Sequence, residues 1–125
     1  MHRDLNVKTQ KIIECSINVH KELGPGLLES TYEACLEYEL LKKDLKVERQ
    51  KELPVIYKGI EINCGYRIDL LVEDLIIVEL KSIDRVEPIH IAQILTYMKL
   101  SKRQLGLLIN FNVKLLKTGI KRIIL

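Results

Sequence analysis

Residues 69–81 read D-L-L-V-E-D-L-I-I-V-E-L-K, and this segment is the most informative part of the chain. Two apolar segments, residues 66–72 and 75–81, flank the pair Glu73-Asp74, which is typical of a tight turn between strands. We therefore expect an antiparallel β-hairpin. Its second strand is almost continuously apolar, which is typical of a strand covered on both faces.

Three ionisable residues interrupt these two strands. Asp69 lies in the first strand, and Glu79 and Lys81 lie in the second, separated by Leu80. Because side chains alternate along a strand, Glu79 and Lys81 share one face, and the hairpin brings Asp69 near Glu79. Two carboxylates buried together repel each other, and one takes up a proton unless a cation lies between them; Mg²⁺ accepts such ligands. The spacing leaves two interpretations open: a metal site, or an ion pair of Lys81 with one acid at a frayed strand end.

The rest of the chain predicts a mixed α/β sheet with helices packed on it. We expect helices at residues 8–22, 27–43 and 88–100, with Gly24-Pro25-Gly26 ending the first. Strands are expected from residue 47 through 57, at 60–62 after a turn at residues 58–59, at 105–110 and at 120–125. A helix between apolar strands implies at least one parallel pair. Apolar residues of the second helix predict a core face made of Leu27, Thr31, Ala34, Tyr38 and Leu41, widened by Leu28, Tyr32, Cys35 and Leu36.

Composition narrows the class of protein. The chain has 125 residues, which is the size of a single domain spanning residues 1–125, and 47% of them are hydrophobic. No run is long enough to span a membrane, and an odd count of three cysteines argues against a disulfide framework. We therefore expect a cytoplasmic protein without a membrane partner. Residues 63–125 carry 10 basic and 6 acidic side chains, a weak indication of a polyanionic partner.

Four further polar residues stand out, and each has an ordinary structural explanation. Glu29 begins a helix, where an acid compensates the helix dipole, and His20 ends one, where a cation does. Gln93 and Tyr97 are four residues apart and share a helix face, as a half-buried polar pair often does. A phosphate-binding glycine loop, an HExxH motif and cysteine-histidine zinc spacing are all missing from the sequence.

Taken in order, these residues resemble a known nuclease signature. Asp69 followed by Glu79-x-Lys81 across a hairpin is similar to the motif of the PD-(D/E)xK nuclease superfamily. Ile68 stands where the broad signature has proline, a position that varies in that superfamily.

Two more segments strengthen the resemblance. Residues 26–32, Gly26-x-x-Glu29-x-x-Tyr32, resemble the motif of the GxxExxY proteins, and Gln93-x-x-x-Tyr97 resembles a motif of recombination-type exonucleases. The similarity extends over residues 9–125. It implies a restriction-endonuclease-like core with the element order α-β-β-β-α-β.

The resemblance also implies a metal site. Asp69 and Glu79 would hold Mg²⁺ or Mn²⁺, together with the Leu80 carbonyl. Lys81 would orient or activate the attacking water, and Glu29 would be a further acid of the site.

Three other residues receive roles from the same resemblance. His20 would be an additional metal ligand, Gln93 would orient the site or touch the substrate, and Tyr97 would contact phosphate. The function implied is a metal-dependent nuclease, with DNA as the expected substrate and RNA as the alternative. The alternatives are a nucleic-acid-binding or regulatory module of the same fold with little turnover, and a structural homodimer module with an incidental acidic pocket. A small nuclease that cuts both strands of a duplex often needs a second copy, so a homodimer is compatible with the nuclease function.

Overall fold

The hairpin expected at residues 69–81 is formed by β4 (Arg67–Val72) and β5 (Ile76–Lys81), which pair antiparallel. The computed structural model describes residues 2–125 and places this hairpin within a five-stranded sheet of order β1-β4-β5-β6-β7. The remaining strands of this sheet are β1 (Val47–Glu52), β6 (Leu105–Asn110) and β7 (Ile120–Ile124). β5 is the central strand and is buried from residue 76 to 80, as its continuous apolar sequence predicts.

One strand pair of the sheet is parallel. β5 and β6 run in the same direction, with Ile76 opposite Leu105 and Lys81 opposite Asn110. The helix α3 (Pro88–Ser101) connects them and packs on β6 so closely that a Cβ on Gly106 would lie 3.0 Å from Ile94 Cδ1. The predicted parallel pair is therefore confirmed, and the mixed sheet with flanking helices is the expected restriction-endonuclease-like architecture.

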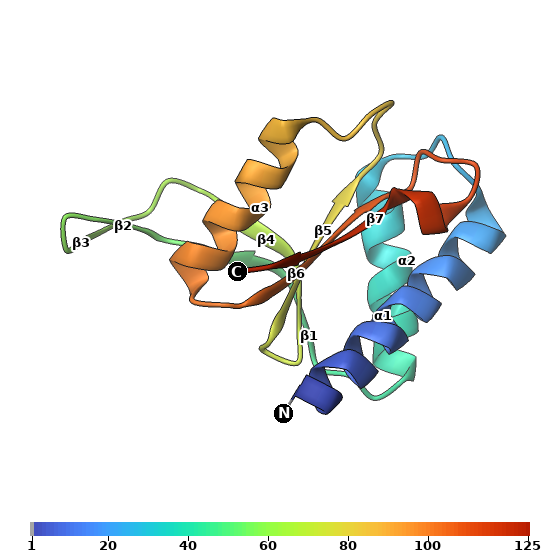
Figure 1. The fold of residues 1–125 in the computed structure, drawn as a ribbon, viewed down its shortest axis with the longest axis horizontal. Helices are drawn as coiled ribbons and strands as arrows, with labels where there is room; N and C mark the ends of the chain where they lie inside the picture. Colours follow the sequence, from blue (N-terminus) through green and yellow to red (C-terminus); the bar gives the residue numbers. More distant parts are fainter. Residues whose placement is uncertain (1) are drawn as a thin grey trace.

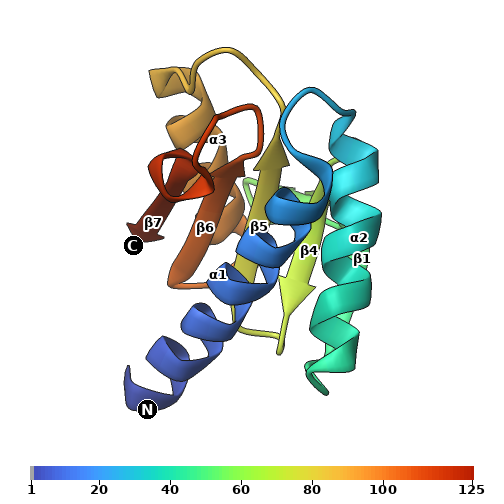
Figure 2. The same cartoon turned by 90° about the vertical axis from the view of Figure 1, so that its right-hand side faces the viewer.

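The helices cover opposite faces of the sheet. α1 (His2–Leu23) and α2 (Glu29–Lys42) pack on one face, and α3 packs on the other, as Figures 1 and 2 show. The core under α1 and α2 contains alternate β5 residues such as Val78 and Leu80, whereas Ile77 faces α3. This alternation gives the sheet two separate hydrophobic cores.

The buried face of α2 differs from the one expected. Tyr32, Leu36 and Leu40 are fully buried, whereas Tyr38 and Leu41 are more than half exposed. Tyr32 stacks on Phe111 of the β6–β7 connection, with ring centroids 4.4 Å apart. The expected face was therefore right at Tyr32 and Leu36 and wrong at Tyr38 and Leu41, because the buried face is centred on this aromatic contact.

A small hairpin leaves the main sheet after β1. β2 (Val55–Tyr57) and β3 (Ile60–Ile62) pair only with each other and project away from the rest of the chain (Figure 1). The sequence predicted one strand from residue 47 through 57, which is wrong. Pro54 lacks a backbone N–H, so the ladder with β4 ends there and the chain turns outward.

Two further observations concern membrane-spanning helices and cysteines. Among residues 2–125, no helix is long and apolar enough to cross a membrane. All three cysteines are free thiols: Cys15 is buried, Cys35 is half-buried and Cys64 is exposed.

Candidate functional site

β4 and β5 separate at the point where their acidic residues lie. β4 pairs with β5 only over residues 70–72, although it pairs with β1 as far as Arg67. Beyond Leu70 two carboxylates take the place of the backbone ladder. The N–H of Asp69 donates to Glu79 Oε2 at 2.8 Å, and the N–H of Leu80 donates to Asp69 Oδ2 at 2.9 Å. Asp69 and Glu79 are therefore held next to each other, as the sequence predicted.

This carboxylate pair is electrostatically unfavourable as long as it faces only protein atoms. Burial raises the pKa of Asp69 to about 6, and the nearby Glu33 carboxylate adds to the rise. Burial, followed by the charge of Asp69, raises the pKa of Glu79 to about 8. Glu79 is only 6% exposed, so water contributes little to its solvation.

A divalent cation fits the chemistry of this donor set. Both side chains offer oxygen atoms, which Mg²⁺ and Mn²⁺ prefer, and a cation would offset the cost of burying two negative charges, which is the main cause of the two raised pKa values. Within residues 2–125, however, no three His, Cys, Asp or Glu side chains lie close enough together to hold a metal on their own. A cation here would therefore need backbone, water or substrate oxygens as its remaining ligands.

Lys81 reaches this site from the end of β5. Its Nζ donates to Gln93 Oε1 at 3.4 Å, and Gln93 Nε2 donates to the Tyr97 hydroxyl at 3.2 Å. Gln93 and Tyr97 lie one turn apart on α3, so this helix fixes the direction of the Lys81 side chain. Burial raises the pKa of Tyr97, which is only 7% exposed and keeps its proton at neutral pH.

The glycine loop between α1 and α2 docks against the end of β5. Figure 2 shows this loop beside the arrowhead of β5. Glu29 Oε2 accepts a hydrogen bond from the Ser82 N–H at 3.1 Å, and the Ser82 hydroxyl donates to the Leu27 carbonyl at 2.6 Å. Tyr32 closes the loop, because its hydroxyl donates to the Gly24 carbonyl at 2.6 Å and accepts from the Leu27 N–H at 3.1 Å. Glu29 thus contacts the chain one residue after Lys81.

Two site residues were missed by the sequence analysis. Glu33 is a buried carboxylate on α2, and its oxygens accept hydrogen bonds from Arg49 Nε and Gln50 Nε2, both at 2.7 Å. Gln50 Nε2 also lies 3.3 Å from Asp69 Oδ1, so the amide joins the two acids. Gln50 adopts φ +53°, a left-handed conformation in the middle of β1. A strained residue at such a position is typical of functional sites.

A signal for Glu33 is present in the sequence. Glu33, Leu36 and Leu40 are spaced three and four residues apart, so the acid lies within the apolar stripe of α2. An acid in such a stripe predicts a buried partner. Gln50 has no comparable signal, because it lies among charged residues of an edge strand.

His20 is engaged elsewhere. Its Nε2 lies 2.8 Å from the Val113 carbonyl oxygen, and its ring is 6.3 Å from that of Phe111. The structure therefore joins His20 to the segment after β6 and does not bring it into the carboxylate pair.

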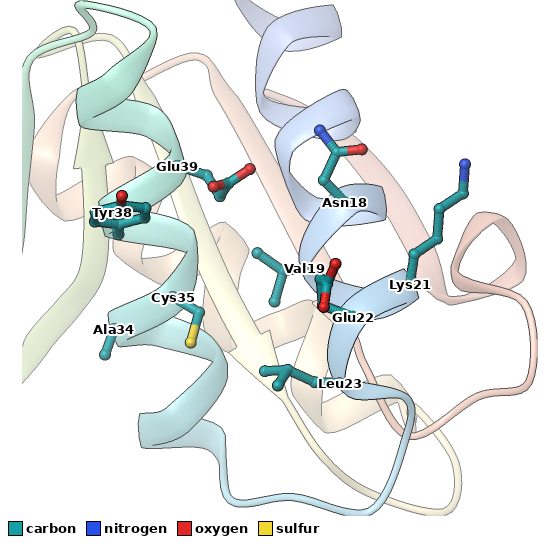
Figure 3. Close-up of a pocket in the computed structure, with 9 residues that line it drawn as sticks. All are labelled: Asn18, Val19, Lys21, Glu22, Leu23, Ala34, Cys35, Tyr38 and Glu39. Atoms are coloured by element: carbon teal, nitrogen blue, oxygen red, sulfur yellow. The ribbon is translucent and has the colours of Figure 1, made fainter.

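A separate apolar pocket of about 610 Å³ lies between α1 and α2. Figure 3 shows Val19 and Leu23 pointing from α1 toward α2, where Cys35 lies, while Lys21 points away. None of the predicted site residues lines this pocket. It is distinct from the site formed by β4, β5 and α3.

The comparisons with known proteins agree with this geometry. The profile of the PD-(D/E)XK nuclease superfamily matches residues 6–123. No curated protein matches the chain, and no solved structure matches it. The match includes β4, β5 and all the residues that surround the carboxylate pair. This chain belongs to the PD-(D/E)XK nuclease superfamily.

Proposed function

We propose that this chain is a Mg²⁺- or Mn²⁺-dependent nuclease that hydrolyses phosphodiester bonds in DNA. The observation that carries the proposal is the buried pair Asp69 and Glu79, held at the point where two strands separate, with Lys81 beside it. Membership of a superfamily that generally uses divalent metals supports it. We further propose that residues 1–125 act as one domain of the GxxExxY type, because residues 26–32 carry that motif.

Each residue of the site has a distinct task in this proposal. Asp69, Glu79 and the Leu80 carbonyl would hold the cation. When bound, the cation would lower the pKa of a water molecule that it coordinates and would place positive charge beside the scissile phosphate. Lys81 orients the attacking water and stabilises negative charge on the phosphate oxygens with its ammonium group. Gln93 holds the Lys81 side chain in place, since its Oε1 accepts from Nζ.

The acids of α2 act through their neighbours. Glu29 accepts from the Ser82 N–H and so positions the backbone that follows Lys81. Glu33 orients Gln50, and Gln50 in turn donates to Asp69 Oδ1. We assign both acids positioning roles. His20 is left out of the metal site, because its Nε2 is engaged with the Val113 carbonyl.

The charge of the site and the free thiols also bear on DNA binding, oligomeric state and cellular compartment. A DNA phosphate approaching two carboxylates is repelled until a cation reverses the local charge, so binding of DNA should depend on the metal. One site cuts one strand, so a homodimer is proposed only where both strands of a duplex are cut. Three free thiols favour a reducing compartment such as the cytoplasm.

The test is a cleavage assay with purified chain, Mn²⁺ and a mixture of linear, circular and single-stranded DNA and RNA. The variant Lys81→Ala removes the ammonium group and leaves the strand backbone intact. We expect loss of cleavage with an unchanged circular dichroism spectrum. The matched control is Lys99→Ala, which removes an exposed lysine of α3.

The outcomes separate the two functional classes. Cleavage by the wild type and the Lys99→Ala variant, but not by the Lys81→Ala variant, supports the nuclease. Equal cleavage by all three proteins contradicts the assigned site. Metal-dependent DNA binding without cleavage supports the alternative, a binding or regulatory module that retains the nuclease fold.

A further inference from the structure

A second pocket adjoins the proposed cleavage site. It has a volume of about 480 Å³ and lies between α3 and the segment that leads into β4. Its lining includes Lys81 from β5, Tyr66 from the segment before β4, and Ile89, Gln93 and Tyr97 from α3. Lys81 and Gln93 belong both to this pocket and to the proposed cleavage site. A group bound in the pocket would therefore lie next to the phosphate that Lys81 contacts.

The walls of the pocket include the ring of Tyr66, which lies tilted against Tyr97 rather than stacked on it. Tyr66 is 47% exposed, and Ile89 is 70% exposed. The Tyr66 ring meets the Tyr97 ring at a tilt of 58° with centroids 6.1 Å apart, so the two rings are not stacked on each other. Large apolar groups left open beside a polar site are typical of a binding surface.

Polar groups accompany this aromatic surface. His90 also lines the pocket, and its Nδ1 accepts a hydrogen bond from the Glu87 N–H at 2.8 Å. In the neutral ring the other nitrogen, Nε2, therefore carries the proton and can donate. Together with the Gln93 amide it provides donors and acceptors near a flat apolar ring, which is the combination that a nucleobase needs.

We propose that this pocket binds one unpaired nucleobase of the DNA substrate, immediately beside the phosphate that is cut. The proposal rests on the proposed nuclease function and adds a substrate class: single-stranded DNA, or duplex DNA that is locally unpaired. A base inside a duplex has both faces covered by its neighbours and its edge engaged by its partner, so it has to leave the stack before Tyr66 can contact it.

The expected contribution of Tyr66 follows from base stacking on aromatic side chains. Removing one such ring weakens single-strand binding roughly 5- to 150-fold. Tyr66→Phe keeps the ring and should bind within about 2-fold of the wild type, because stacking depends on the π-face rather than the hydroxyl. Tyr66→Leu keeps apolar bulk and loses the stacking surface.

The binding test uses single-stranded oligonucleotides that contain 2-aminopurine, whose fluorescence falls when the base stacks. The Lys81→Ala protein with Mn²⁺ serves as the background, so that the oligonucleotide stays intact. Tyr66→Leu and Tyr66→Phe are compared in this background, and Tyr38→Leu removes an exposed tyrosine of α2 as the matched control. We expect quenching that Tyr66→Leu abolishes and the other two variants retain.

A cleavage test keeps this proposal distinct from the nuclease proposal. In the chain with Lys81 intact, Tyr66→Leu should lower kcat/KM for single-stranded DNA by the factor seen in binding. Cleavage of blunt duplex and single strands at equal rates, both unaffected by Tyr66→Leu, overturns the base pocket while the nuclease stands. Quenching that depends on Tyr66, in a wild-type protein that cuts nothing, supports the pocket and overturns the nuclease.

Discussion

Replacing Glu79 by glutamine should stabilise the metal-free protein at pH 8. Glu79 is 6% exposed, and burial and the charge of Asp69 raise its pKa from 4.5 to about 8. Glutamine has nearly the same shape, and its Oε1 can still accept the hydrogen bond that the Asp69 N–H gives to Glu79. The substitution therefore removes a costly buried charge and keeps the contact.

The magnitude follows from linkage between proton binding and folding. Between pH 4.5 and about 8 the folded chain retains a proton on Glu79 that the unfolded chain has released. Stability from this group is therefore fully present below pH 4.5 and is lost as the pH rises through about 8. At about 1.4 kcal/mol per pKa unit, the loss reaches about 4 kcal/mol at pH 8. Burial of the new amide offsets part of this, so we expect a gain of about 2 to 4 kcal/mol.

The assay is urea denaturation of both proteins in a chelating buffer at pH 4.5, 6 and 8. The difference in unfolding free energy between the variant and the wild type should be largest at pH 8 and nearly absent at pH 4.5. Excess Mn²⁺ should stabilise the wild type and leave the variant almost unchanged, because a ligand stabilises the state that binds it. Glu14→Gln, on the exposed surface of α1, is the matched control.

Two results would refute this reasoning. A variant no more stable than the wild type at pH 8 would show that the carboxylate is well solvated or already paired. A difference of the same size at pH 4.5 and pH 8 would show that the gain comes from packing rather than from charge.

Three further substitutions test the scaffold of the site. Gln50→Gly should be about 1 kcal/mol more stable than Gln50→Ala in urea denaturation, because glycine tolerates φ +53°. Both variants should bind Mn²⁺ more weakly than the wild type in calorimetric titration. Tyr32→Phe should lose about 1 to 3 kcal/mol, measured in the same way, because the glycine loop loses its two hydrogen bonds to the buried hydroxyl; unchanged stability would contradict a role for this hydroxyl in closing the loop. Gly106→Ala should lower the thermal midpoint by an amount equivalent to about 1 to 3 kcal/mol, since the new methyl would overlap α3 at 3.0 Å.

The centre of the site could be predicted from sequence because it is local. Asp69, Glu79 and Lys81 lie on two strands joined by a tight turn, so the alternation of side chains and the position of the turn place them together. Apolar periodicity also predicted α3 and the parallel pairing of the strands on either side of it. These inferences need no knowledge of distant contacts.

The second layer of the site depends on distant contacts and was therefore missed. Glu33 and Gln50 come from a helix and an edge strand that meet only when α2 packs on the sheet. An acid on a helix is usually solvated, and a glutamine among charged residues gives no periodic signal. The strand expected through residue 57 was wrong for a similar reason, because the sequence alone does not show that pairing with β4 ends before Pro54.

Where β4 separates from β5, the two acids and the lysine of the site contribute differently to the stability of the fold. Asp69 and Glu79 take the place of backbone partners in the sheet, so either residue serves the fold even when no substrate is present. The Lys81 side chain makes one long hydrogen bond to Gln93 and, unlike the two acids, replaces no backbone partner in the sheet. A lineage that no longer needs the reaction could therefore lose the lysine freely, whereas positions 69 and 79 would still need side chains, carboxylate or amide, that accept these hydrogen bonds. If the proposed role of Lys81 holds, a related chain with the two acids and another residue at position 81 would fold without cleaving nucleic acid, and the acids alone would not identify an active enzyme.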